Sequence, residues 1–320
     1  MKGITMKRIT AIILTLLLPV VIVTGCNPSD GPGTDKLNIV CTIFPQYDWV
    51  SQILGDHAEK AEITLLLNSS IDLHSYQPSV DDIMKISTCD LFIYVGGESD
   101  NWVDNALKQA SNREMITINL LETLGNKAKA EEIVEGMEDT EVDYDEHVWL
   151  SLQNAQIFCE VITEALSMLD PESANDYQTN LGTYNEQLVA LNDQYQEMAD
   201  TAGTKTLLFG DRFPFRYLVD DYELSYFAAF LGCSAETEAS FETVVFLANK
   251  MDEINLHTVM VTESADQSIA KTIVNNTAGK NQQILVLDSL QGTTLREADN
   301  GASYLSIMEN NLMVLREALK

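Results

Sequence analysis

Residues 170–203, with the sequence DPESANDYQTNLGTYNEQLVALNDQYQEMADTAG, have the pattern of one long amphipathic helix. Asp170 is placed to cap its start, Pro171 suits the first helical position, and Gly203 interrupts the pattern. Between these ends, apolar or aromatic residues recur in steps of three and four: Ala174, Tyr177, Leu181, Tyr184, Leu188, Leu191, Tyr195 and Met198. About 32 residues at about 1.5 Å each give roughly 48 Å, more than the width of one small lobe. The pattern therefore predicts a helix that braces two lobes, with a coiled-coil dimer seam as the alternative.

Short apolar runs typical of β-strands lie on both sides of this helix. They cover residues 37–43, 63–67, 91–95 and 116–120 before it, and 206–209, 258–262 and 284–287 after it. Helical patterns such as residues 241–254 separate them, and strands that alternate with helices indicate parallel sheets. The predicted fold class is therefore α/β: an N-terminal lobe over residues 37–170, a linking helix over 171–202 and a C-terminal lobe over 203–320.

The N-terminal 25 residues have the pattern of a signal peptide. Lys2, Lys7 and Arg8 precede an uncharged apolar run at residues 9–23. That run is too short for a typical membrane span of about 20 residues. Residues 23–26, VTGC, resemble the bacterial lipoprotein processing box, which would make Cys26 the lipidated N-terminus of an extracytoplasmic protein anchored to the cell membrane. An ordinary signal peptide without lipidation is the alternative, and residues 26–36 have the composition of a flexible tether.

The charge of the chain excludes some classes of partner. The formal net charge is −30, and removal of the three cations of the signal segment gives 16 − 49 = −33. Such a field repels nucleic acid and anionic lipid and attracts cations. The cysteines after Cys26 form no CxxC pair of the kind found in thiolate zinc sites, so we interpret them as buried residues, with a disulfide between Cys41 and Cys89 as a less favoured option.

Two of the four histidines are candidates for metal ligation. His74 lies in a loop after the predicted strand at 63–67, and ligands of open parallel sheets bind beyond the carboxyl ends of strands. His147 is flanked by Asp145 and Glu146, carboxylates that could orient a ligating imidazole. Taken alone, each of these histidines could be an ordinary polar loop residue. His57 and His257 lie near predicted helix ends and are assigned to the surface.

Several segments together resemble one family, the zinc and manganese substrate-binding proteins of ABC importers. The resemblance covers nearly the whole mature chain, through residues 72–79, 89–97 with Trp102, 145–151, 215–218 and 304–319. It implies two α/β lobes joined by one long helix, with a single metal ion held between them. It also implies that His74 and His147 are ligands supplied by the first lobe.

The second lobe departs from the family pattern. Members usually place a histidine or glutamate three residues before the phenylalanine matched here by Phe215, and this chain has Arg212 there. A guanidinium cannot ligate a cation, so Asp211 is the substitute. The fourth ligand of the family follows a later strand, where Glu263 and Asp266 remain alternatives. Asp266 could also serve only as a helix cap.

These observations predict a binding protein rather than an enzyme. Two imidazoles with one or two carboxylates suit Zn²⁺, the favoured cargo, and also Mn²⁺. Binding should weaken as pH falls through the histidine range near about 6.5. The expected partner is the permease of an ABC importer. The alternatives are a siderophore or chelate carrier, an adhesin with a structural metal, and a zinc metallohydrolase, although the chain has neither HExxH nor GxSxG.

Overall fold

A computed structural model describes residues 36–69, 73–137, 143–232 and 239–320. The predicted signal peptide, Cys26, nearly all of the predicted tether and Asp72 lie outside these ranges. Within them, no helix combines the length and apolar character that a membrane span requires.

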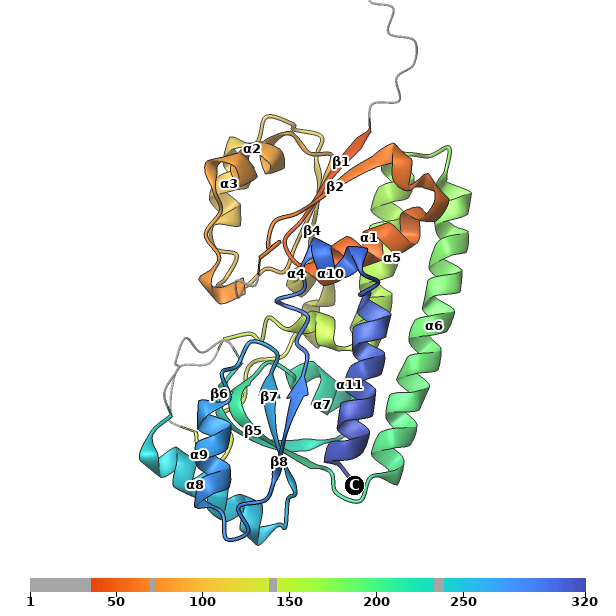
Figure 1. Cartoon of the computed structure of the whole chain (residues 1–320). Coiled ribbons are helices and arrows are strands. Elements are labelled where there is room, and N and C mark those ends of the chain that lie inside the picture. The colour runs from red at the N-terminus through yellow and green to blue at the C-terminus, as the bar shows by residue number, and fades with distance from the viewer. Residues whose placement is uncertain (1–35, 70–72, 138–142, 233–238) are drawn as a thin grey trace, which may run out of the picture. The chain divides into compact units, whose positions relative to one another are not determined.

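The first half of the described chain builds a four-stranded parallel sheet with the strand order β2-β1-β3-β4 (Figure 1). Its strands are β1 (Leu37–Cys41), β2 (Ala61–Leu65), β3 (Leu91–Tyr94) and β4 (Ile116–Asn119). Its helices are α1 (Phe44–Leu54), α2 (Val80–Thr88), α3 (Val103–Gln109), α4 (Leu120–Leu124) and α5 (Leu152–Leu169), with short 3-10 turns η1 (Gly55–Lys60), η2 (Leu73–Ser75), η3 (Gly125–Lys127) and η4 (Val148–Leu150). All four predicted strands of this half are present.

The second half repeats this plan with a parallel sheet of order β6-β5-β7-β8. Its strands are β5 (Thr206–Phe213), β6 (Ser225–Leu231), β7 (Thr258–Thr262) and β8 (Gln283–Leu287). Its helices are α7 (Arg216–Asp221), α8 (Phe241–Glu253), α9 (Ser268–Asn276), α10 (Leu295–Asp299) and α11 (Tyr304–Ala318). Strand β6 was not predicted from the sequence, and it forms the edge of this sheet beside β5.

The long helix is α6, Ala174–Thr201, which runs beside α5 and α11 in Figure 1 and also contacts α1. Its 28 residues correspond to about 42 Å. The predicted stripe from Tyr177 to Met198 is buried in this packing, so the chain itself covers the surface that a coiled-coil partner would need.

The prediction that this helix starts at Pro171 was wrong by three residues. Asp170 N donates to Leu166 O (2.8 Å) at the end of α5, and Ser173 N donates to Asp170 O (3.2 Å) in a turn. The Asp170 carboxylate accepts from Tyr177 Oη (3.0 Å) and Lys60 Nζ (3.0 Å). Because Asp170 is engaged in this way, it links α5 to α6 instead of capping α6.

One apolar core contains residues from both sheets and from α6. Trp49 is fully buried in it, with its ring centroid 5.2 Å from that of Tyr304 and 5.6 Å from that of Phe158. Cys41, Cys89 and Cys159 are buried free thiols, so the Cys41–Cys89 disulfide is not formed. Cys233 lies outside the described residues.

Candidate metal-binding site

Two imidazoles meet at the carboxyl end of the first sheet. His74 lies in η2, which follows β2, and His147 immediately precedes η4. Their Nε2 atoms are 3.3 Å apart, although 73 residues separate them in the sequence. The structure therefore brings together the two histidines that the sequence singled out.

His147 is fully buried and is held by its neighbour Asp145. The Asp145 Oδ1 atom lies 2.9 Å from His147 Nδ1 and also accepts from His147 N (2.8 Å). Tyr217 Oη donates to Asp145 O (3.1 Å), so a residue of the second half fixes this loop. Nδ1 of His147 thus faces a carboxylate, which leaves Nε2 directed at His74.

His74 has a different set of partners at Nδ1. This atom lies 2.7 Å from Ser99 Oγ and 3.5 Å from Glu146 Oε2. Glu146 is 2% exposed, and its Oε1 atom accepts from Ser99 N (2.9 Å). Burial raises the pKa of Glu146, and the hydrogen bonds from Ser99 oppose that shift. Glu146 is a neighbour of His147 in the sequence, yet its carboxylate faces His74.

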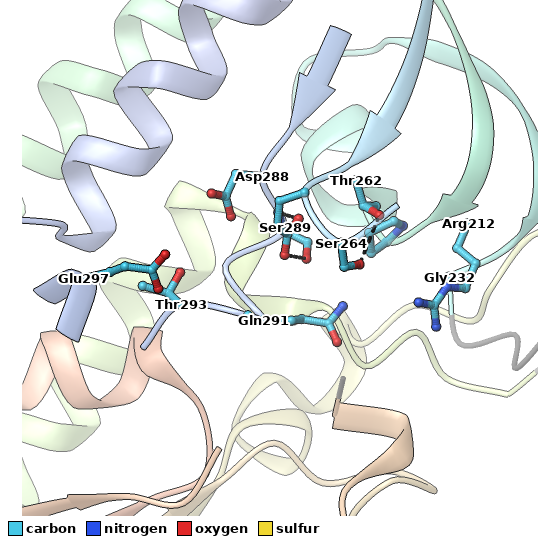
Figure 2. A pocket seen from close by; sticks show the side chains of 12 residues that line it. Arg212, Gly232, Thr262, Ser264, Asp288, Ser289, Gln291, Thr293 and Glu297 are labelled. Carbon is cyan, nitrogen blue, oxygen red and sulfur yellow. Dashed lines mark hydrogen bonds between the residues drawn. The ribbon is translucent and has the colours of Figure 1, made fainter. Parts of the chain in front are cut away.

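A cavity of about 370 Å³ lies beyond the ends of the second sheet and adjoins the imidazole pair. Gly232, one of its lining residues, is so close to His147 that a Cβ atom would come within 3.1 Å of His147 Cε1. Gln291, another lining residue, accepts from Leu73 N (3.4 Å). Figure 2 shows Asp288 and Glu297 on one side of the cavity, Arg212 on the other, and the Gln291 amide between them.

Two acidic side chains follow adjacent strands at the wall of this cavity. Glu263 comes after β7 and accepts from Ser289 N and Ser289 Oγ, both at 2.8 Å. Asp288 comes after β8, and its pKa is raised to about 7, mainly by burial and further by the charge of Glu263. The sequence analysis did not select Asp288, although an aspartate directly after a strand was a usable signal.

The other predicted carboxylates make structural contacts and do not line the cavity. Asp211 Oδ2 accepts from Thr262 N (3.0 Å) and Thr262 Oγ1 (2.5 Å), which joins the end of β5 to the end of β7. Asp266 is exposed, and its Oδ1 atom accepts from Ser268 N (2.7 Å) at the first turn of α9. Among the described residues, no group of three or more His, Cys, Asp and Glu side chains is assembled for a metal ion.

The remaining histidines lie away from this pair. His57 Nε2 is 2.8 Å from Asp176 Oδ2, an ion-pair contact between η1 and α6. His257 is exposed just before β7, with Nε2 3.4 Å from Asn255 Nδ2.

Two parallel-sheet lobes on one long helix, with paired imidazoles at the strand ends, define the class as a solute-binding protein of the metal-binding type. The sequence profile described as "Zinc-uptake complex component A periplasmic" matches residues 39–318. The chain belongs to this zinc-uptake component A family.

Named relatives agree with this assignment. The zinc-binding lipoprotein AdcA of Streptococcus pneumoniae is 29% identical over 316 residues, which cover 98% of this chain and 61% of AdcA. The high-affinity zinc uptake system protein ZnuA of Bacillus subtilis is 29% identical over 93% of this chain and 94% of its own length. The crystal structure of the Zn(II)-bound ZnuA-like domain of S. pneumoniae AdcA superimposes with a TM-score of 0.70 at 28% identity, covering 89% of this chain and 99% of that domain.

Proposed function

We propose that this protein captures Zn²⁺ outside the cytoplasm and passes it to the permease of an ABC importer, while a lipid on Cys26 anchors it to the membrane. Membership of the zinc-uptake component A family supports this function, as do relatives that are named as zinc-binding lipoproteins and zinc uptake proteins. The proposed role is binding and delivery, not catalysis. The predicted lobe limits, 37–170 and 203–320, remain part of this proposal, and the helix between them is α6, Ala174–Thr201.

The observation that carries the proposal is the 3.3 Å distance between His74 Nε2 and His147 Nε2. Zinc binds imidazole nitrogen at about 2.0–2.1 Å, and two such nitrogens at a tetrahedral angle lie about 3.3–3.4 Å apart. The two imidazoles are thus already spaced as two ligands of one tetrahedral ion. The presence of two imidazole ligands favours Zn²⁺ as the cargo over Mn²⁺, which prefers more oxygen ligands.

The surroundings of both rings favour the same protonation pattern. A metal binds the unprotonated nitrogen of a neutral imidazole, and the other nitrogen usually donates to an oxygen acceptor. His147 has Asp145 at Nδ1, and His74 has Ser99 and Glu146 at Nδ1. Both rings can therefore keep a proton on Nδ1 and offer the Nε2 lone pair to the ion.

The further ligands in this proposal are carboxylates of the second half. Glu263 and Asp288 line the cavity beside the imidazole pair, and Asp288 is a candidate that the sequence did not reveal. Asp211 and Asp266 are assigned structural roles instead, because neither lines the cavity and one oxygen of each already accepts from Thr262 or Ser268. Arg212 is at the cavity wall, where a guanidinium donates hydrogen bonds and ligates no cation.

Competitive titration with a chromophoric zinc chelator tests this function on the mature protein. We expect one Zn²⁺ per chain, with at least a hundredfold loss of affinity in His74→Ala and in His147→Ala. His257→Ala is the matched control, because it removes an exposed imidazole, and its affinity should equal that of the unmodified protein. Unchanged zinc binding after loss of both His74 and His147 would refute the assignment, and tighter binding of Mn²⁺ than of Zn²⁺ would change the cargo.

Additional variants test the carboxylates. Glu263→Gln and Asp288→Asn should each weaken zinc binding, whereas Asp266→Asn should not. A residue whose substitution leaves the zinc affinity unchanged is removed from the proposed set of ligands.

A further inference from the structure

The carboxylate of Glu146 is buried in a loop region that is shaped around it. Gly97, which follows β3 and has a φ of +81°, leaves space for it, because a Cβ atom there would lie 2.3 Å from Glu146 Oε1. Only glycine adopts such a φ readily, so both the backbone and the missing side chain accommodate the carboxylate. The β3 loop and the segment that carries His147 are fitted to each other at this point.

The two oxygens of Glu146 have different surroundings. Oε1 accepts from Ser99 N (2.9 Å), a contact that stabilises the loop after β3. Oε2 is buried and has no hydrogen-bond partner among the described residues, and His74 Nδ1 lies 3.5 Å away. Stabilisation of the loop explains the position of Oε1 but not that of Oε2. Burial of a carboxylate oxygen without a hydrogen bond costs free energy, so the position of Oε2 requires another explanation.

Within the described ranges, Oε2 makes its ion-pair contact with His74 Nδ1. The side chains of His74 and Glu146 are 10% and 3% exposed, so water screens their interaction little. A carboxylate beside Nδ1 favours the tautomer that carries its proton on Nδ1. That tautomer leaves the lone pair on Nε2, the atom that faces His147.

We propose that Glu146 is a positioning residue for His74, which holds the imidazole in the Nδ1–H tautomer with Nε2 directed at His147. The consequence for metal affinity rests on the proposed zinc function, whereas the tautomer itself does not. In this arrangement each imidazole of the pair has its own carboxylate, Asp145 for His147 and Glu146 for His74.

The variant Glu146→Gln distinguishes a role in positioning His74 from a role in stabilising the loop after β3. The single oxygen of glutamine can still accept from Ser99 N, so the loop contact is retained. The amide NH₂ group then faces His74 Nδ1 and favours an unprotonated Nδ1, which moves the proton to Nε2 and blocks the metal-binding lone pair. A residue that only stabilises the loop would tolerate this substitution, and a positioning residue would not.

The first measurement is made without metal. Ring ¹⁵N chemical shifts of His74, from long-range ¹H–¹⁵N spectra of the mature protein, should report the Nδ1–H tautomer in the unmodified protein and the Nε2–H tautomer in Glu146→Gln. The same tautomer in both proteins would overturn the inference. Because no zinc is present, this result is independent of the proposed function.

The second measurement is zinc affinity by the same chelator competition. We expect Glu146→Gln to bind about 10- to 100-fold more weakly, the usual effect of losing a carboxylate that orients a ligating histidine. Asp48→Asn is the control, since it also removes a buried carboxylate, one that contacts Tyr304 N and Tyr184 Oη instead of an imidazole. Equal affinities of Glu146→Gln and the unmodified protein would contradict the positioning role, and failure of the unmodified protein to bind zinc would refute only the proposed function.

Discussion

The buried carboxyl group of Asp100 should make the stability of the metal-free protein depend on pH. Asp100 is 4% exposed, and its Oδ2 atom accepts from Val95 N and Gly96 N, both at 2.9 Å. Burial raises its pKa from 3.8 to about 7, with a further contribution from the charge of Glu146. Between these two pKa values the folded protein holds a proton that the unfolded chain has lost, so stability falls as pH rises from about 4 to about 7.

The size of the stability change follows from the pKa shift of Asp100. From pH 5 to pH 7 the folded state keeps the proton over about two pH units, and at about 1.4 kcal/mol per unit this group removes about 2–3 kcal/mol of stability. Asp100→Asn abolishes the titration, while its amide oxygen can still accept from the two backbone N–H groups. Relative to the unmodified protein, Asp100→Asn should therefore gain about 2–3 kcal/mol in unfolding free energy between pH 5 and pH 8.

Urea unfolding of the metal-free protein, followed by the fluorescence of the buried Trp49 and Trp149, measures this difference at both pH values. Comparing each variant with the unmodified protein at the same pH cancels the contribution of other titrating groups. Asp104→Asn, which changes an exposed carboxylate on α3, is the control and should show no such pH dependence. An Asp100→Asn effect of equal size at pH 5 and pH 8 would refute the reasoning.

Three further variants test other parts of the structure. Gly97→Ala should destabilise the protein by about 1–3 kcal/mol, because it adds strain at a positive φ and a Cβ atom against Glu146, and a thermal unfolding midpoint equal to that of the unmodified protein would contradict this. Thr262→Val removes the hydroxyl that donates to Asp211 and should cost about 1–2 kcal/mol in urea unfolding; an unfolding free energy equal to that of the unmodified protein would contradict a structural role for this contact. Leu188→Ala in α6 should cost about 2–5 kcal/mol while the protein keeps the same oligomeric state in gel filtration, since this side chain is fully buried within the chain.

Most of the fold could be predicted from the pattern of apolar residues along the sequence. The stripe of α6 and the seven predicted strands could be identified because burial on one face or in a parallel sheet imposes a regular pattern on the sequence. Strand β6 was missed because its sequence, SYFAAFL, contains none of the β-branched residues that mark the other strands. The start of α6 was misplaced because Asp170 has a cap-forming sequence context but a tertiary role with Lys60 and Tyr177.

The candidate site was only partly accessible from the sequence. His74 and His147 were identified from their loops and from the family resemblance, but their 3.3 Å separation depends on the packing of distant segments. The sequence suggested that Glu146 serves its neighbour His147, and the backbone instead turns its side chain toward His74. The place of Asp288 beside Glu263 depends on the pairing of β7 with β8, which no local pattern specifies.

The contacts around His147 also determine when during biosynthesis the site can be completed. Trp149 Nε1 donates to Ser289 O (2.8 Å), and Tyr304 Oη donates to Trp149 O (2.7 Å), across 140 and 155 residues of sequence. A growing chain that already contains both histidines lacks these supports until Ser289 and Tyr304 have been translated. The segment that follows His147 therefore acquires these two hydrogen bonds only after the second half of the chain has been made.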